Sequence, residues 1–361
     1  MVEILQSRER QQLMVEILQS NEVDDENLYV LDENDPLGVL SSTREVVEQG
    51  EYAWINTDKV EALGRQWIED EDGEAPFTPI WYDRYHFFDG TERTVNWLLV
   101  LDALNFCFWA EKNQPRWRIT YQGETLNGYW AEAAALTRAV EEGIPLWDAE
   151  YLRNLSSEEL AHIFRGTPES PTIPLFEQRL ENAREVGRVL LERYDGQFAR
   201  AIEQVEGSAA QLALLLAEHF SSFHDVTTYR NREVRFFKRA QICVADLHGA
   251  FGGKSWGTFT DLDQLTIFAD YKVPQVLRHL GVLEYHPSLA ERIDNQELIE
   301  AGSEEEVELR AAAIWAGELL RRELAHAGRT VTAVEIDQRL WLLSQNLPEL
   351  RPYHRTRTIY Y

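Results

Sequence analysis

The sequence predicts an all-α fold with at most a small β-hairpin. Three observations favour this class. Apolar residues recur at helical spacing along most of the chain, several of these stretches follow residues that typically cap helices, and no strands alternate with them as a doubly wound sheet would require. At 361 residues, the chain is long enough for about two folding units or one large helical domain.

The N-terminal part of the chain differs in composition from the rest. Residues 1–35 are acidic and polar, so we interpret them as an appendage to a helical domain of residues 36–361. The heptapeptide MVEILQS occurs at 1–7 and again at 14–20, but a repeat this short does not indicate a repeat fold. Residues 69–79 (EDEDGEAPFTP) have the composition of a linker.

Helix signals begin soon after the appendage. Ser42 with Glu45 fits a capping box, and apolar residues recur at helical spacing after Thr57. Thr91 is expected to cap a long, largely apolar core helix that continues to Trp109. Helices are therefore expected before and after the linker.

One later segment departs from helical spacing. Residues 116–121 (RWRITY), followed by Gly123, suggest a strand and a turn. Ser156 and Glu159 then form another capping box ahead of a helix. Further helices are expected over residues 174–193, 208–219, 234–251, 304–326 and 331–345.

Composition and charge exclude several classes of protein. The chain has 35 basic and 62 acidic residues, a net charge of −27; this repels phosphate backbones, so we expect no direct tRNA or DNA binding. Two cysteines, Cys107 and Cys243, are too few for a disulfide framework. The longest apolar stretch, Trp97–Leu101, is too short to span a bilayer, and the first twenty residues lack an apolar leader. We therefore expect a cytoplasmic protein without a membrane partner.

Familiar catalytic motifs are absent or imperfect. GAFGGKS at 249–255 resembles a phosphate-binding loop, but three residues separate Gly249 from Gly253 where the pattern requires four. We interpret these glycines as the end of a helix. The sequence contains no H-E-x-x-H, so metal catalysis is not expected. GKSWG at 253–257 matches the letters of G-x-S-x-G, but it follows a helical segment instead of the strand that a nucleophile elbow requires, so serine hydrolase chemistry is not expected.

Two basic runs stand out in this acidic chain. Residues 230–239 (RNREVRFFKR) hold five cations against one acid, Glu233, and a second run extends from Arg351 to Arg357. Both are natural places for a small anion such as a phosphate to bind. The alternative is that they are solvated faces that neutralise acidic neighbours.

Asp270 is a candidate site residue with two interpretations. It lies between Phe268 and Tyr271, ahead of an expected helix that tolerates Pro274 in its first turn. Its carboxylate could simply cap that helix. Alternatively, with Lys272 nearby, it could lie beside a planar ring and stabilise a developing cation.

Other acidic residues lie in expected helices. Asp337 falls one turn before Trp341; a solvated surface acid is the default interpretation, whereas an inward-facing carboxylate would suit the donor-rich edge of a heterocycle. Asp102 and Asn105 share one face of the expected core helix. Both need partners if they are buried.

Strings distributed over residues 80–361 point to one known family. They are VNWLLVLDALNFCFW (95–109), GYW (128–130), EEGIPL (141–146), FFKRAQICVADL (236–247), FADYKVPQVLRHLG (268–281), EVELRA (306–311) and HRTRTIYY (354–361). On these strings the chain resembles the queuosine salvage protein family. The resemblance is specific because no single string carries it, and residues 1–35 contribute nothing to it.

The resemblance implies a fold and an activity. The fold would be similar to the helix-hairpin-helix DNA glycosylases, with the substrate in a central cleft between two helical lobes. The activity would be hydrolysis of queuosine 5′-phosphate to queuine and ribose 5-phosphate, in queuine salvage for tRNA modification. No cofactor is implied.

The resemblance also implies roles for particular residues. Asp270 of the FADY motif would be the nucleophile or the transition-state stabiliser, with Phe268 lining the base pocket. Asp337, in a D-x-x-L-W pattern, would contact the base, and His86, upstream of the VNW motif, would contact the ligand. The candidate cations for the 5′-phosphate are Lys238, Arg239 and Lys272.

This activity matches the chemistry expected of a fixed carboxylate. Breaking an N-ribosidic bond passes through a ribosyl cation, which a carboxylate beside C1′ stabilises or traps covalently before water completes the hydrolysis. Queuine is a 7-deazapurine and lacks the N7 atom at which purine leaving groups are usually protonated. Two alternatives stay open: a nucleotide hydrolase for another purine-like base, and a non-catalytic helical interaction protein.

Overall fold

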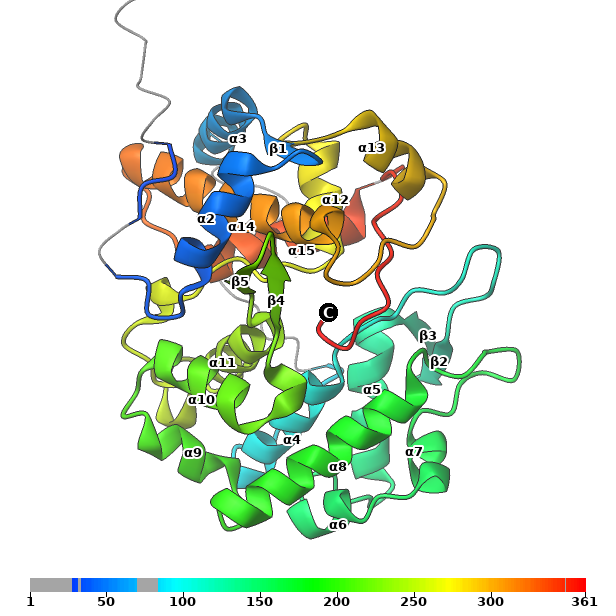
Figure 1. The fold of residues 1–361 in the computed structure, drawn as a ribbon. Helices are drawn as coiled ribbons and strands as arrows, with labels where there is room; N and C mark the ends of the chain where they lie inside the picture. Colours follow the sequence, from blue (N-terminus) through cyan, green and yellow to red (C-terminus); the bar gives the residue numbers. More distant parts are fainter. Residues whose placement is uncertain (1–27, 32–33, 70–83, 348) are drawn as a thin grey trace, which may run out of the picture. The chain divides into compact units, whose positions relative to one another are not determined.

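The computed structural model describes residues 28–31, 34–69, 84–347 and 349–361. Residues 35–361 group into one compact unit. In its described residues this unit consists of α-helices and three short antiparallel strand pairs, so the expected predominantly helical fold is confirmed (Figure 1). The repeated heptapeptide and nearly all of the expected linker lie outside the described residues.

The described part of the chain contains helices from α2 to α15. They are α2 (Val39–Gln49), α3 (Thr57–Glu69), α4 (Glu92–Leu104), α5 (Gly128–Glu141), α6 (Ala149–Arg153), α7 (Ser157–Ile163), α8 (Phe176–Arg193), α9 (Phe198–Gln204), α10 (Ala209–His219), α11 (Lys238–Ala250), α12 (Lys272–His279), α13 (Pro287–Asp294), α14 (Glu304–His326) and α15 (Ala333–Asn346). The strand pairs are β1 (Ala53–Ile55) with β6 (Leu283–Tyr285), β2 (Arg118–Tyr121) with β3 (Glu124–Asn127), and β4 (Val226–Tyr229) with β5 (Arg232–Arg235). Single 3₁₀ turns are η2 (Ser221–Phe223), η3 (Ser255–Gly257) and η4 (Leu262–Gln264).

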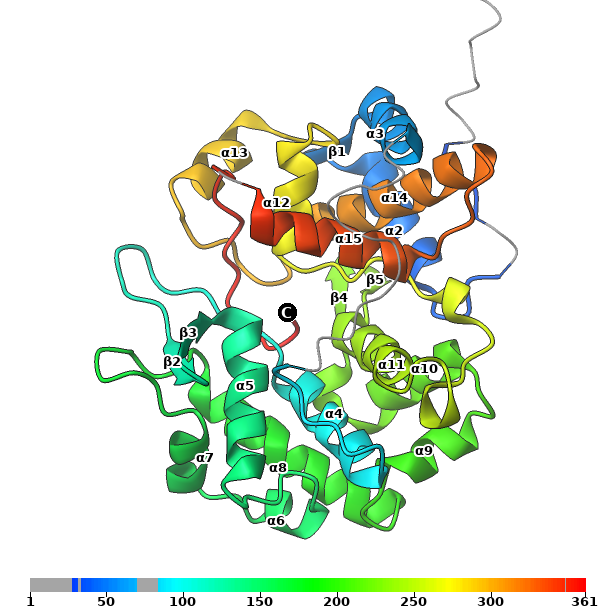
Figure 2. The ribbon, with the colours of Figure 1, turned by 180° about the vertical axis from the view of Figure 1, so that it is seen from behind.

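The helices of residues 35–361 pack in two groups. Helix α14 packs against α2, α3, α12 and α15, whereas α4 packs against α5, α8, α9 and α11. Figure 1 and, from behind, Figure 2 show the α14 group on one side and the α4 group on the other, with the β4–β5 hairpin reaching from α11 toward α14.

Helix α4 is the core helix that the sequence predicts. It begins as expected after Thr91, whose Oγ1 accepts a hydrogen bond from Arg93 N at 3.1 Å. From Thr94 to Leu104 every residue is buried. In the described part of the chain, neither this helix nor any other is long and apolar enough to cross a bilayer.

Helix α4 ends at Leu104, which is earlier than the predicted end at Trp109. Three buried side chains, those of Arg179, Asn182 and Arg239, donate hydrogen bonds to the last backbone carbonyls of the helix. These donors satisfy the carbonyls that a helix end leaves without partners. The chain can therefore leave the helical path while still buried, which periodicity alone does not reveal.

The predicted capping boxes have different outcomes. The box of Ser156 and Glu159 is confirmed at the start of α7. The box of Ser42 and Glu45 is wrong, because α2 already begins at Val39 after a left-handed glycine. Ser42 lies inside the helix, where its Oγ donates to the backbone carbonyl of Val39 at 3.2 Å.

The strand content exceeds the single hairpin expected. The strand suggested at 116–121 is confirmed as β2, which pairs with β3 across a turn at Gly123. The helix expected over 234–251 begins only at Lys238, because the preceding residues belong to β5 and Phe237 has a left-handed backbone with φ of 49°. The β1–β6 pair joins segments far apart in the sequence, which local patterns do not indicate.

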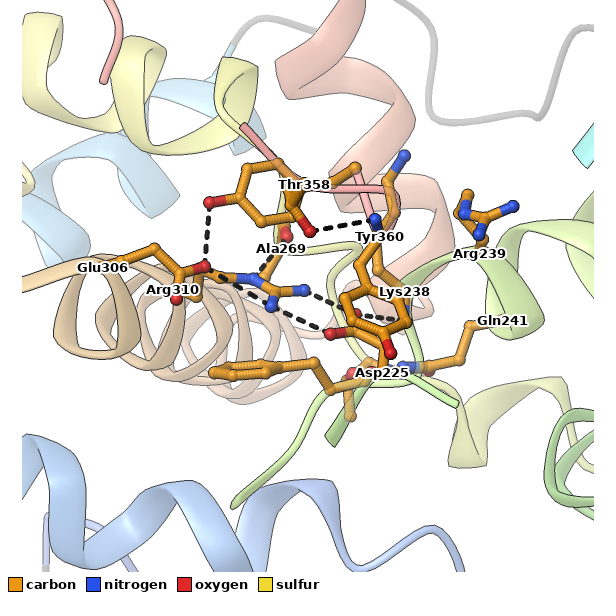
Figure 3. Close-up of polar contacts among 12 residues, drawn as sticks. Asp225, Lys238, Arg239, Gln241, Ala269, Glu306, Arg310, Thr358 and Tyr360 are labelled. Atoms are coloured by element: carbon orange, nitrogen blue, oxygen red, sulfur yellow. Dashed lines mark hydrogen bonds and ion pairs between the residues drawn. The ribbon is translucent and has the colours of Figure 1, made fainter. Parts of the chain in front are cut away.

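A buried ion pair links α14 to both segments that carry candidate site residues (Figure 3). The two Nη atoms of Arg310 donate to the two carboxylate oxygens of Asp225 at 3.0 and 2.6 Å, and Arg310 Nε donates to the backbone carbonyl of Ala269 at 3.0 Å. Asp225 also accepts from the backbone N–H of Lys238 at 3.2 Å. One guanidinium therefore holds the start of α11 and the residue before Asp270.

Three residues of the C-terminal segment, His354, Thr356 and Tyr361, are buried, and Tyr361 lies beside this ion pair. The Tyr361 hydroxyl donates to Glu306 Oε1 at 2.8 Å, and the Cys107 N–H donates to the Tyr361 carbonyl at 3.0 Å. The Arg310 guanidinium carbon lies 4.5 Å from the centre of the Tyr361 ring. His354 is 2% exposed, and burial, with a smaller effect of Arg310, lowers its pKa to about 3.

Replacing Asp225 with Ala should destabilise the fold strongly, because the buried Arg310 would lose both of its hydrogen bonds to a carboxylate and keep only Glu306, whose Oε1 lies 3.6 Å from Nη1. We expect a loss of about 3–5 kcal/mol in the free energy of unfolding, measured by urea denaturation. The control is Glu45→Ala, which removes the partner of the exposed Arg232 and should cost at most about 1 kcal/mol. Equal losses in the two variants would contradict the assigned role of the ion pair.

His354 should make stability fall as the pH decreases below 6.5. The unfolded histidine binds a proton near its ordinary pKa of 6.5, whereas the folded one stays neutral down to about pH 3. Between pH 7 and pH 5 this residue should therefore cost about 2 kcal/mol of the free energy of unfolding. Urea denaturation of wild type and His354→Gln at both pH values measures it. Parallel pH dependences in the two proteins would refute the assignment.

Candidate active site

A cavity of about 240 Å³ lies where the two groups of helices meet. Its walls come from the first turn of α5, one face each of α11 and α15, the segment 268–272 and the chain that follows α4. Six of the seven residues that the sequence predicted for the site line this cavity: His86, Lys238, Phe268, Asp270, Lys272 and Asp337.

Arg239, the seventh, does not line the cavity. It is 1% exposed, and its guanidinium donates to three backbone carbonyls at the end of α4 and in η2. Elsewhere in the basic runs, Arg230, Arg232, Arg235 and Arg357 form ion pairs with acidic neighbours. For these four arginines the alternative interpretation, neutralisation of acidic surfaces, is correct.

Asp270 is both a helix cap and part of the cavity wall. Its Oδ1 accepts hydrogen bonds from the backbone N–H groups of Lys272 at 2.6 Å and Val273 at 2.9 Å, in the first turn of α12. The predicted capping role is therefore confirmed, with Pro274 in the same turn. A helix N-terminus is a favourable place for a negative charge, and the two N–H donors fix the orientation of the carboxylate in the cavity.

Lys238 is the buried cation at the centre of this site. It is 5% exposed, and burial lowers its pKa, while the negative charges of Asp270, Asp337 and Asp102 oppose that shift. Burial likewise lowers the pKa of Lys272, again opposed by Asp270. Asp270 therefore lies within electrostatic reach of both lysines.

Asp337 faces inward from α15, so the surface interpretation of this residue is wrong. Its Oδ1 accepts a hydrogen bond from the backbone N–H of Phe268 at 2.9 Å. It is 7% exposed, and burial raises its pKa well above the usual range, with a further contribution from the charge of Asp270. The Phe268 ring and the Asp337 carboxyl thus share one wall of the cavity.

Aromatic side chains form another wall. His86 Nε2 lies 2.8 Å from the Tyr129 hydroxyl. The centre of the Trp130 ring lies 5.3 Å from those of Tyr129 and Trp341, and the Tyr129 and Trp341 ring centres lie 6.1 Å apart. All four residues line the cavity. The GYW string therefore supplies part of the site.

Of the two polar residues expected on one face of the core helix, Asp102 lies in α4 and is fully buried, whereas Asn105 follows the end of the helix and lines the cavity. Burial, with the nearby charge of Asp246, raises the pKa of Asp102 well above its usual range, which favours the neutral carboxyl. Neither carboxyl oxygen of Asp102 has a hydrogen-bond partner in the described part of the chain. Both cysteines, Cys107 and Cys243, are buried free thiols.

Sequence reasoning missed two charged residues of the cavity, Asp246 and Arg116. Asp246 could have been found, because it follows Lys238 by eight residues on α11 and therefore falls on nearly the same helix face. Arg116 precedes β2 in the sequence, and no spacing rule connects it with the other site residues. In the described part of the chain, no group of three or more His, Cys, Asp or Glu side chains is arranged to bind a metal ion.

The arrangement suits chemistry that develops positive charge on a ligand. A carboxylate held in a fixed orientation stabilises a cation beside it more strongly in a water-poor cavity than in solvent. Aromatic rings and an inward carboxyl provide surfaces for a planar heterocycle. Cations on the same wall can balance an anionic group of that ligand.

Comparison with known proteins identifies the family of this chain. The family model described as queuosine salvage protein matches residues 85–361. The chain is 50% identical over 331 residues to the queuosine 5′-phosphate N-glycosylase/hydrolase of Sphaerobacter thermophilus, covering 91% of this chain and 99% of that protein. Proteins of the same name from Bos taurus and Schizosaccharomyces pombe are 38% and 33% identical, over 75% and 85% of this chain and 82% and 91% of theirs. The chain therefore belongs to the queuosine salvage protein family.

Proposed function

We propose that this protein is an N-glycosidase that hydrolyses queuosine 5′-phosphate to queuine and ribose 5-phosphate. The observation that carries the proposal is Asp270, a carboxylate held by the N-terminus of α12 and lining the cavity beside Lys238. The names of the relatives support the substrate. Residues 36–361 would form the catalytic domain, with the substrate between the two groups of helices.

In the proposed reaction the bond between C1′ of the ribose and the base nitrogen breaks, and its electron pair leaves with the base. Positive charge develops on the ribosyl group, and Asp270 stabilises that charge or forms a bond to C1′. Water then forms the new C1′–O bond and loses a proton, while the base nitrogen gains one. Because a 7-deazapurine lacks N7, stabilisation on the ribosyl side carries more of the rate enhancement.

The base is assigned to the wall formed by Phe268 and Asp337. Burial opposes ionisation of Asp337, and the single N–H of Phe268 offsets only part of that cost. A guanine-like edge, with an N1–H and an amino group, would supply the missing donors. Base binding would thereby favour the charged, accepting form of Asp337. His86, which lines the same cavity, is assigned a contact with the ligand.

The 5′-phosphate is assigned to Lys272 and Lys238, together with Arg116. Arg116 opposes protonation of Lys272, so two like charges repel each other in the free protein. A phosphate dianion placed between them would turn that repulsion into attraction. Arg239, whose donors hold the end of α4, is assigned a supporting role behind Lys238.

The free nucleotide, rather than intact tRNA, is the proposed substrate. A chain of net charge −27 repels the phosphate backbone of a tRNA, whereas a single phosphate can be held by the few cations of the cavity. Two alternatives make different predictions. A nucleotide hydrolase for another base would turn over GMP at a comparable rate, and a non-catalytic interaction protein would lose no function with Asp270.

Replacing Asp270 with Asn should abolish most of the activity, because the amide carries no charge to stabilise the ribosyl cation. We expect release of queuine from queuosine 5′-phosphate, followed by chromatography, to slow by roughly 10²- to 10³-fold or more. The matched control is Asp261→Asn, which alters a carboxylate that accepts from Ala209 N at the start of α10, outside the residues lining the cavity. Near wild-type release by a folded Asp270→Asn protein would remove the residue from the mechanism, and comparable turnover of GMP by wild type would favour the other base.

Lys272→Gln should weaken use of the nucleotide without affecting the nucleoside. If this lysine binds the 5′-phosphate, kcat/KM for queuosine 5′-phosphate should fall about tenfold or more, and kcat/KM for queuosine should stay the same. The control is Lys254→Gln, which makes the same charge change at an exposed residue. A parallel decrease for both substrates would assign Lys272 to the reaction centre instead of the phosphate.

A further inference from the structure

Asp246 is a cavity carboxyl to which the proposed reaction assigns no role. It lies on α11, on nearly the same face as Lys238 and eight residues after it, and lines the cavity. Its Oδ2 is buried without a hydrogen-bond partner in the described part of the chain. Burial raises the pKa of Asp246 to about 7, and Lys238 offsets only part of that rise. A buried carboxylate short of donors gains from any cation that enters beside it.

The aromatic wall lines the same cavity as this carboxyl and comes from other elements. Tyr129 and Trp130 lie in the first turn of α5, and Trp341 lies on α15. The planes of Tyr129 and Trp130 meet at 60°, those of Trp130 and Trp341 at 68° and those of Tyr129 and Trp341 at 86°, so the rings do not stack on one another, and all three line the cavity. The negative charge of Asp246 contributes to raising the pKa of Tyr129, which places the two side chains within electrostatic reach across the cavity.

Three aromatic rings and one carboxylate form a recognition site for an ammonium group. Ring faces attract cations, most strongly where water is excluded, and a carboxylate adds a charge-assisted hydrogen bond. Asp246 differs from Asp270 in its surroundings, because Asp270 acts on both Lys238 and Lys272, whereas Lys238 is the one cation that offsets the effect of burial on Asp246. A ligand ammonium beside Asp246 would supply a partner for the carboxylate oxygen that has none in the described part of the chain.

We propose that Asp246, with Tyr129, Trp130 and Trp341, binds the protonated amine on the side chain of the base and thereby selects an aminomethyl-substituted 7-deazaguanine over guanine. The inference rests on the proposed function. Asp337 addresses the pyrimidine edge, which guanine and queuine share, so it cannot distinguish the two bases. The side-chain amine distinguishes them, and a neutral guanine would leave the Asp246 carboxyl without its partner.

The first test uses the wild-type protein and two bases of similar size. The probes are 7-aminomethyl-7-deazaguanine, which carries a protonated amine, and 7-cyano-7-deazaguanine, which is neutral. Isothermal titration calorimetry should show at least tenfold tighter binding of the amine at pH 7.5. Equal affinity for the two bases, or tighter binding of the nitrile, would overturn the proposal, and neither outcome depends on whether a variant folds.

The second test identifies the carboxyl that is responsible. Asp246→Asn should weaken binding of the aminomethyl base about tenfold or more and leave binding of the cyano base unchanged. Asp337→Asn should weaken both, because both bases carry the same edge. If Asp246→Asn weakened the two bases equally, its role would be structural and the proposal would fail.

The proposed function and the subsite can fail separately. Absence of queuine release from queuosine 5′-phosphate by wild type, together with a preserved preference for the aminomethyl base, would refute the hydrolase while supporting the ammonium site. Normal queuine release without any preference between the two bases would support the hydrolase and refute the ammonium site.

Discussion

The arrangement of the cavity depends on the buried pairing of Arg310 with Asp225. A guanidinium buried to 3% exposure is costly unless all its donors are used, and here they hold two separate parts of the chain. Asp225 links Arg310 to the backbone N–H of Lys238 at the start of α11, and the carbonyl of Ala269 links Arg310 to the segment before α12. Figure 3 shows both contacts converging on Arg310 from α14. The relative position of Lys238 and Asp270 is therefore a consequence of one residue that does not line the cavity.

The cavity gathers ionisable side chains in the protein interior, and burial shifts the pKa values that set their protonation states. Burial raises the pKa of Asp102, Asp246 and Asp337 and lowers that of Lys238. Each group is thus biased toward its neutral form until a partner of opposite charge approaches. A ligand with separated cationic and anionic groups would find partners for both, whereas an uncharged heterocycle would not.

The end of α4 shows how buried arginines shape the site without touching a ligand. Arg179 and Arg239 satisfy backbone carbonyls that would otherwise require further helix or water. The chain can therefore leave the helix inside the core, where Asn105, Phe106 and Phe108 become part of the cavity wall. An arginine expected to bind phosphate, Arg239, is instead occupied by the backbone.

The sequence by itself determined the helical class, most helix positions and six residues of the cavity, because apolar periodicity, caps and family motifs are local properties. It indicated Asp270 as a helix cap, and the structure adds that the same carboxylate lines the cavity. Only the tertiary structure decided that α4 stops at Leu104, that Arg239 donates to backbone carbonyls and that Asp246 lines the same cavity as the aromatic wall. These features depend on contacts between residues distant in the sequence, and on burial, which sets the charge of each group and cannot be read from local spacing.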